Sequence, residues 1–404
     1  MQRTAITKCE CQPLRSQIDS EQIITNFPAA KLYLHAYFES LSKRLMSDLI
    51  RMSRRAFLGA GLFAGTSLLL KGCGGNEASQ GNGGRLVAAT FTGSWEEAHR
   101  TILVPYFAQK IGATVNLVPQ LAIDQVAQLT ASANSPPYDV TLLDEGPFRN
   151  APVEQILQPF PVDLSENFQD LLPQYQTKAD QWGPTIAVQA IGIGYNTERI
   201  STPPTSWEDL WKPEYAGRLG LVSMQSTVGT AFMVQLARMR GGGENNIEPA
   251  FEAIREILPN VAAVASNPGA LSVLFQQGEI DIAPHYLNNM APLTAAGTPV
   301  DWVVPQEGAL LISPSMHVVR NPRERELAAA YIDAAISPEV QTQMASAPYY
   351  FVPTNSKAQI SGFIAERLGN TTEAVVDKLI PLDWQTISKN LPTWIERFNR
   401  EVVV

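Results

Sequence analysis

The sequence predicts an α/β protein of two lobes, each built on a mostly parallel β-sheet flanked by helices. Two observations carry this prediction. Strand and helix patterns alternate from residue 85 onward, and a second α/β block over about 190–283 interrupts the first block. An inserted block makes the chain cross between lobes more than once. The 404 residues are 45% apolar and 17% charged, a globular composition that excludes collagen-like and wholly disordered chains.

The first block begins with a β-rich run over 85–91 and a turn at Thr92 and Gly93. Ser94 is expected to cap the next helix, because acidic residues follow it in the first turn. Further strands are predicted at 113–118 and 138–143, and further helices at 123–133 and 151–157. This order indicates a parallel sheet with helices on both faces.

The second block begins with the apolar segment 185–195, which fits either a buried strand or a crossing between lobes. Strands are then predicted at 219–223 and 279–283, and helices at 229–240, 249–257, 268–275, 287–296, 323–336, 338–345 and 384–401. The predicted lobe 1 is 85–187 plus 284–345, and lobe 2 is 188–283 plus 346–404, with hinges near 187–194 and 283–286.

Residues 52–73 have the features of an export signal, because Arg54 and Arg55 precede an apolar run that ends at Leu70. The run is shorter than the ~20 residues of a membrane-spanning helix. The paired arginines resemble a twin-arginine signal. The segment up to Cys73 resembles a lipoprotein box, so Cys73 is a candidate for acylation, with an unmodified thiol as the alternative.

Two segments flank this signal. Residues 1–51 are interpreted as an over-called start or a disordered cytoplasmic extension. Residues 74–84 are rich in Gly, Asn, Ser and Gln, which predicts a flexible linker. The expected location is the periplasm or the outer face of the cytoplasmic membrane, with membrane contact only through a lipid anchor.

Charge and motifs exclude several functions. The net charge of −9 argues against a nucleic-acid partner. No cysteine follows Cys73, so a disulfide framework is not expected in the body of the chain. The chain lacks a P-loop, a Gly-x-Ser-x-Gly elbow and a His-Glu-x-x-His motif, and the glycine pair Gly192 and Gly194 lacks the third glycine of a dinucleotide site. We therefore expect neither an enzyme nor a bound cofactor.

Several stretches, taken in order, resemble the extracellular solute-binding proteins of ABC importers, and among them the spermidine/putrescine-binding group. These stretches are 205–217, 258–262, 278–282, 296–301, 305–308 and 350–355. The resemblance implies a two-lobed fold of the type II periplasmic-binding-protein kind that closes on a small solute. It also implies delivery of the solute to membrane permease subunits. We expect the protein to be a monomer.

Ligands of open α/β sheets bind beyond the carboxyl ends of the strands. The predicted ligand-binding residues at these ends are Ser94, Trp95, Asp144, Glu145, Ser226, Thr227 and Tyr286. The resemblance assigns cleft positions to Trp95 and Tyr286, whereas either acid is able to accept a hydrogen bond from an ammonium group. Each residue also has a structural alternative: the aromatic rings are able to pack in the core, and the acid and hydroxyl side chains are able to cap helices.

Departures from the polyamine-binding group affect the expected solute. The loop over 223–229 contains no acid, and Pro314 stands near the position of a further acid in that group. Hydroxyls and amides at the start of a helix favour a small zwitterion or organic anion, and a polyamine-like amine remains the other option. Some ferric-binding relatives have paired tyrosines at the position of His285 and Tyr286, where this chain has one tyrosine, so a ferric-iron receptor of the same fold is a further alternative. A periplasmic enzyme and an adhesin-like lipoprotein are others.

Overall fold

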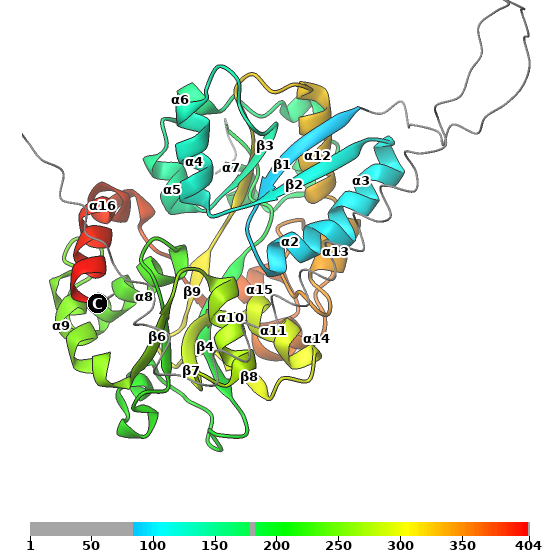
Figure 1. The fold of residues 1–404 in the computed structure, drawn as a ribbon. Coiled ribbons are helices and arrows are strands. Elements are labelled where there is room, and N and C mark those ends of the chain that lie inside the picture. Colours follow the sequence, from blue (N-terminus) through cyan, green and yellow to red (C-terminus); the bar gives the residue numbers. More distant parts are fainter. Residues whose placement is uncertain (1–83, 178–181, 403–404) are drawn as a thin grey trace, which may run out of the picture. The chain divides into compact units, whose positions relative to one another are not determined.

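The computed structural model describes residues 84–177 and 182–402, which form two β-sheets flanked by helices (Figure 1). The predicted extension at 1–51, the export signal at 52–73 with Cys73, and all of the predicted linker except Gly84 lie outside the described residues. Within the described ranges, no helix is both long enough and apolar enough to cross a membrane.

The first sheet has the strand order β10-β3-β1-β2, with β10 antiparallel to β3 and the other pairs parallel. Its strands are β1 (Arg85–Thr90), β2 (Thr114–Pro119), β3 (Val140–Leu143) and β10 (Ser315–Val318). Alternate side chains of β1 enter different cores: Leu86 and Ala88 pack in one, and Val87 and Ala89 in another. This period of two places helices on both faces of the sheet.

The helices that flank the first sheet follow the predicted order, with one additional helix at Glu145–Asn150. They are α2 (Ser94–Ala98), a π-helix (His99–Leu103), α3 (Val104–Ile111), α4 (Ala122–Ala131), α5 (Glu145–Asn150), α6 (Val153–Ile156), α12 (Arg325–Ala335) and α13 (Pro338–Met344). A short helix α7 (Pro173–Thr177) precedes the second sheet.

The second sheet has the strand order β11-β9-β4-β7-β5-β6, and β8 also pairs with β4. Its strands are β4 (Gln189–Asn196), β5 (Leu219–Val222), β6 (Val261–Ala265), β7 (Ile282–Tyr286), β8 (Val300–Val303), β9 (Ala309–Ile312) and β11 (Leu379–Ile380). The helices that accompany it are α8 (Thr227–Met239), α9 (Glu248–Ile257), α10 (Pro268–Gln277), α11 (Leu287–Ala295), α14 (Gly362–Arg367), α15 (Thr372–Val376) and α16 (Trp384–Glu401).

The second sheet is mixed, which differs from the mostly parallel sheet that the sequence predicts. Strand β4 runs antiparallel to β7, β8 and β9. The two glycines of β4 make room for its neighbours: a Cβ on Gly192 would lie 2.4 Å from the Trp302 ring, and one on Gly194 would lie 2.7 Å from Met290. The glycine pair therefore serves close packing of β8 and α11 on β4.

The boundary between the two sheets also differs from the prediction at residue 284. The sequence predicts that residues 284–312 belong to lobe 1, but β7, β8 and β9 belong to the second sheet. The segment 283–286, expected to be a hinge, is part of β7. The chain instead returns to the first sheet at residues 313–314, between β9 and β10. The predicted strands do not include β8 and β9, whose place in the sheet depends on pairing with the distant strand β4.

The segments that join the two sheets lie side by side. Thr185 pairs with Ser315, and Val188 pairs with Val352, in isolated antiparallel bridges. The crossing predicted near Ala187 therefore lies next to two later crossings of the chain.

Candidate functional site

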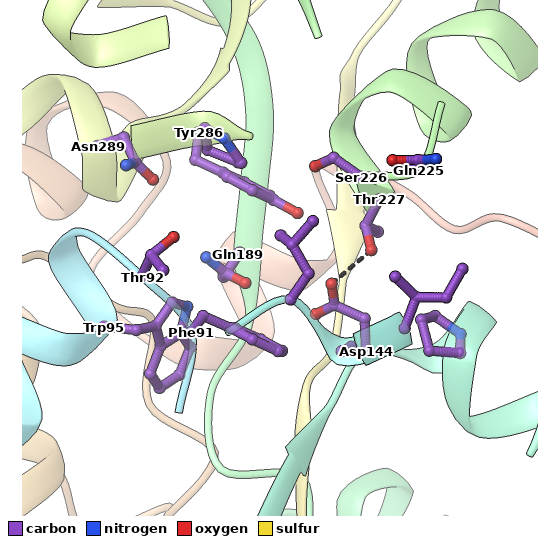
Figure 2. Close-up of a pocket in the computed structure, with 15 residues that line it drawn as sticks. Phe91, Thr92, Trp95, Asp144, Gln189, Gln225, Ser226, Thr227, Tyr286 and Asn289 are labelled. Carbon is purple, nitrogen blue, oxygen red and sulfur yellow. Dashed lines mark hydrogen bonds between the residues drawn. The ribbon is translucent and has the colours of Figure 1, made fainter. Parts of the chain in front are cut away.

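The side chains predicted to bind a solute gather around a cavity of about 40 Å³ between the two sheets (Figure 2). The lining follows the carboxyl ends of β1, β2 and β3 in the first sheet and of β5 and β7 in the second. The predicted residues that line it are Trp95, Asp144, Ser226, Thr227 and Tyr286. Ser94 and Glu145 lie outside the lining.

Asp144 lies at the end of β3, immediately before α5, and its side chain is 7% exposed. Its Oδ2 accepts a hydrogen bond from the Thr227 hydroxyl, and its Oδ1 has no partner among the described residues. Burial raises the pKa of Asp144 to about 7; the Thr227 hydrogen bond opposes this shift, and the neighbouring charge of Glu145 adds to it. The carboxyl therefore changes charge near neutral pH.

Thr227 is the first residue of α8 and brings the second sheet into contact with Asp144. The start of this helix packs closely on the end of β5: a Cβ on Gly229 would lie 2.3 Å from the carbonyl oxygens of Val222 and Ser223. Ser226 occupies the N-cap position, but its side chain makes no capping hydrogen bond within the described chain. The capping alternative for Thr227 is not observed, since its hydroxyl donates to Asp144.

The aromatic side of the cavity is formed by Trp95, Phe91 and Tyr286. Trp95 is 3% exposed, and its ring packs 4.1 Å from the Phe351 ring between centroids. Trp95 is therefore both a core residue and a lining residue, and its Nε1 has no acceptor in the part of the chain that the structure describes. Burial and the charge of Asp144 raise the pKa of Tyr286 well above its usual value.

Ser94 does not cap α2, contrary to the prediction. Gly93 takes the N-cap position with φ 77°, a left-handed backbone that favours glycine. The Ser94 hydroxyl instead accepts a hydrogen bond of 3.1 Å from Asn288 Nδ2, and Asn288 Oδ1 accepts one of 3.0 Å from Gln189 Nε2. Ser94 thus contacts the start of α11 and helps to hold the two sides of the site together.

Several polar residues of the lining are absent from the predicted set. Gln189 begins β4, and Asn289 follows Tyr286 by three residues on the first turn of α11. The three-residue spacing is a usable signal, because the third residue of a helix lies close to the N-cap residue, which here is Tyr286. Of the described residues that line the cavity, Asp144 is the one carboxyl, and none is Lys, Arg or His.

A second cavity of about 70 Å³ lies on the other side of Ser226 and Thr227. Its lining is mostly apolar and comes from α4, α5, α8 and α16; it includes Pro147, Met224, Trp384 and Leu391. At this cavity, helix α16 contacts α5, which flanks the first sheet. The Trp384 ring lies so close to Gly146 of α5 that a Cβ on Gly146 would be 2.8 Å from it. Figure 1 shows α16 beside both α5 and α9.

His285, the residue that suggested an iron site, is buried in the core and does not line the cavity. Its ring is fully buried, its Nε2 lies 3.0 Å from Ser272 Oγ, and burial lowers its pKa to about 3. Across residues 84–177 and 182–402, no three His, Cys, Asp or Glu side chains gather as metal ligands would.

Comparisons with known proteins agree with this architecture. The sequence profile of bacterial extracellular solute-binding proteins matches residues 135–364. The spermidine/putrescine-binding periplasmic protein of Salmonella typhimurium is 29% identical over 245 residues, 58% of this chain and 66% of the relative. Its namesake in Escherichia coli is 30% identical over 211 residues, 51% of this chain and 55% of the relative. The chain thus matches between about half and two thirds of the length of these relatives.

Solved structures share the fold over almost their whole length. The periplasmic binding protein AfuA of Actinobacillus pleuropneumoniae, solved with fructose-6-phosphate, superposes with a TM-score of 0.66 at 21% identity, over 80% of this chain and 99% of that one. AgtB of Agrobacterium, in complex with agropinic acid, gives a TM-score of 0.67 at 18% identity, over 80% of this chain and 99% of that one. With the profile match over more than half of its length, the chain belongs to the bacterial extracellular solute-binding protein family.

Proposed function

We propose that the protein is the solute-binding component of an ABC importer. It captures a small solute in the cavity between the two sheets and presents it, chemically unchanged, to membrane permease subunits. The observation that carries this proposal is the cavity at the strand ends of both sheets, bridged by the bond from Thr227 to Asp144. Open α/β sheets bind ligands at this edge.

Capture requires contacts that exist only when the two sides meet. Three such contacts support closure: Thr227 with Asp144, Asn288 with Ser94, and Trp384 with Gly146. A bound solute favours the closed form by as much as it binds that form more tightly than the open one. A solute that touches both sides of the cavity therefore favours the form in which these three contacts are made.

The fold leaves the solute class open. Two relatives carry the name spermidine/putrescine-binding protein, whereas AfuA, with the same fold, was solved with fructose-6-phosphate. A polyamine-like amine and a small zwitterion or anion are therefore both compatible with the family. The lining of the cavity, rather than the fold, distinguishes between them.

The location follows from the amino-terminal pattern. Export by a twin-arginine-like signal that contains Arg54 and Arg55, followed by acylation at Cys73, would hold the receptor at the outer face of the cytoplasmic membrane. A monomer tethered by the linker at 74–84 is free to meet its permease.

A thermal-shift screen tests the function. The purified protein is heated with amines, amino acids, sugar phosphates and carboxylates, and each solute is then recovered and analysed by mass spectrometry. We expect at least one solute to raise the unfolding temperature and to be recovered unaltered, because binding to the folded state stabilises it. Chemical turnover of the solute, or the absence of stabilisation across the screen, would contradict the proposal.

A further inference from the structure

We propose that the solute carries one positive charge, on a nitrogen that donates a hydrogen bond to Asp144 Oδ1, and that the rest of the solute is uncharged. This inference rests on the proposed function and deepens it. It differs both from the zwitterion or anion that the sequence favours and from the polycation that the relatives' names indicate.

One oxygen of the buried Asp144 carboxyl is available to a solute. Oδ2 is satisfied by Thr227, but Oδ1 is buried without a partner among the described residues. A buried carboxylate oxygen that lacks a donor is costly, and a charged N–H donor is the strongest partner for it. An ammonium group in the cavity supplies both the hydrogen bond and the opposite charge.

The lining also limits the number of positive charges that the solute carries. The other polar groups of the described lining are uncharged hydroxyls, amides and the Trp95 indole N–H; the hydroxyls and amides include Thr92, Gln189, Gln225 and Asn289. A second ammonium group would be enclosed without a carboxylate, and an unpaired buried charge is strongly unfavourable. The lining therefore accommodates one cation and disfavours two or three.

An anionic solute fits this lining poorly, for two reasons. The start of α8 is the natural place for a negative group, but the Asp144 carboxyl already occupies it through Thr227. No Lys, Arg or His of the described residues lines the cavity. An anionic solute would thus meet Asp144 without a compensating base.

The aromatic side of the cavity complements a small cation that has one hydrogen-bond acceptor. Trp95, Phe91 and Tyr286 present rings to the lining, and a cation near such rings gains electrostatic attraction. Trp95 Nε1, a buried donor with no partner within the described ranges, is able to donate to a hydroxyl or carbonyl of the solute. A compact amino alcohol or amino amide has both features.

A series of four-carbon compounds that differ only in charge tests this inference. The probes are putrescine with two charges, 4-amino-1-butanol with one, 1,4-butanediol with none, and 4-hydroxybutanoate with one negative charge. Dissociation constants are measured by titration calorimetry at pH 8 with the purified protein. We expect 4-amino-1-butanol to bind at least tenfold more tightly than each of the other three.

Two matched variants locate the charge effect. D144N should remove the preference for 4-amino-1-butanol over 1,4-butanediol. D124N, on the exposed start of α4, should leave the preference intact. Asp124 lies beside the cavity without lining it, so it controls for the general loss of a negative charge nearby.

The remaining outcomes separate the two proposals. Tighter binding of putrescine or of 4-hydroxybutanoate would overturn the single-charge inference and leave the receptor function standing. If D144N keeps the same preference for 4-amino-1-butanol over 1,4-butanediol as the unaltered protein, the ammonium group lies elsewhere and the inference is overturned. No binding of any of the four compounds overturns the inference, and if the thermal-shift screen is also without effect, the proposed function fails with it.

Discussion

The hydroxyl of Thr227, at the start of α8, donates a hydrogen bond to the Asp144 carboxyl at the end of β3. This bond joins a helix of the second sheet to a strand end of the first, directly at the cavity (Figure 2). It therefore couples the position of the two sides to the one carboxyl among the described lining residues.

Replacing Thr227 by Val removes the donor and keeps the shape of the side chain. In the closed form, Asp144 would then lose its partner, at a cost of about 1–3 kcal/mol, which corresponds to a loss of roughly tenfold to a hundredfold in solute affinity. Titration calorimetry with the solute that stabilises the protein most measures this loss. Thr130→Val, which removes a hydroxyl bonded within α4, should leave affinity unchanged. Equal affinities in both variants would contradict a closing role for Thr227.

The pH dependence of stability should reveal the buried carboxyl. Because the pKa of Asp144 is raised to about 7, the folded protein binds a proton between about pH 4 and pH 7 that the unfolded chain has released. Stability from this group is thus lost as pH rises through that range. The Thr227 hydrogen bond opposes the raised pKa of Asp144, and the charge of Glu145 adds to it; the pKa of Tyr286 lies well above its usual value, so Tyr286 is neutral at these pH values.

D144N removes this effect. In the closed form, in which Asp144 is buried, the variant should gain on the order of 2 kcal/mol in unfolding free energy relative to the unaltered protein between pH 5 and pH 8. Urea unfolding at both pH values measures the difference. A stability difference that does not depend on pH would contradict a raised pKa at Asp144.

Gly146→Ala tests whether α16 contributes to closure. A Cβ at this position would lie 2.8 Å from the Trp384 ring, a contact made only when α5 and α16 meet. Overpacking of this kind costs about 1–3 kcal/mol, and it should lower solute affinity without lowering the stability of the open protein. Since Ala favours helix over Gly, unfolding in the absence of solute should not become easier.

A double variant provides the control for this contact. Adding Trp384→Phe to Gly146→Ala makes the ring smaller, so affinity should recover towards that of the Trp384→Phe single variant. A Gly146→Ala protein with unchanged affinity would show that α16 does not take part in closure.

Export provides a prediction outside the described residues. Replacing Arg54 and Arg55 together by Lys should trap the precursor in the cytoplasm, whereas Arg51→Lys should not. Cys73→Ser should move the exported protein from the membrane fraction to the soluble periplasmic fraction. Cell fractionation and immunoblotting detect both changes. Unaltered export of the double variant would point to the general secretion route.

Elements with a strong period were predictable from the sequence. The predicted helix at 384–401 coincides with α16, and the strand predicted at 219–223 corresponds to β5. Local periodicity carries this information within one segment. The direction in which β4 pairs with its neighbours depends on distant strands, so the mixed character of the second sheet was not predictable.

The site was predictable in outline, because strand ends in an α/β protein converge on one edge. The sequence did not decide between Asp144 and Glu145, which are adjacent and diverge in space. Gln189 and Asn289 were missed because their place in the lining depends on how the two sheets meet. Ser94 was predicted as a cap, but its hydroxyl has a tertiary partner in Asn288.

The most direct test of closure on a solute is small-angle X-ray scattering of the purified protein, with and without the solute that gives the largest thermal shift. We expect a smaller radius of gyration with bound solute, and a smaller change in Thr227→Val at the same solute concentration. Scattering profiles that remain identical at saturating solute would contradict the account.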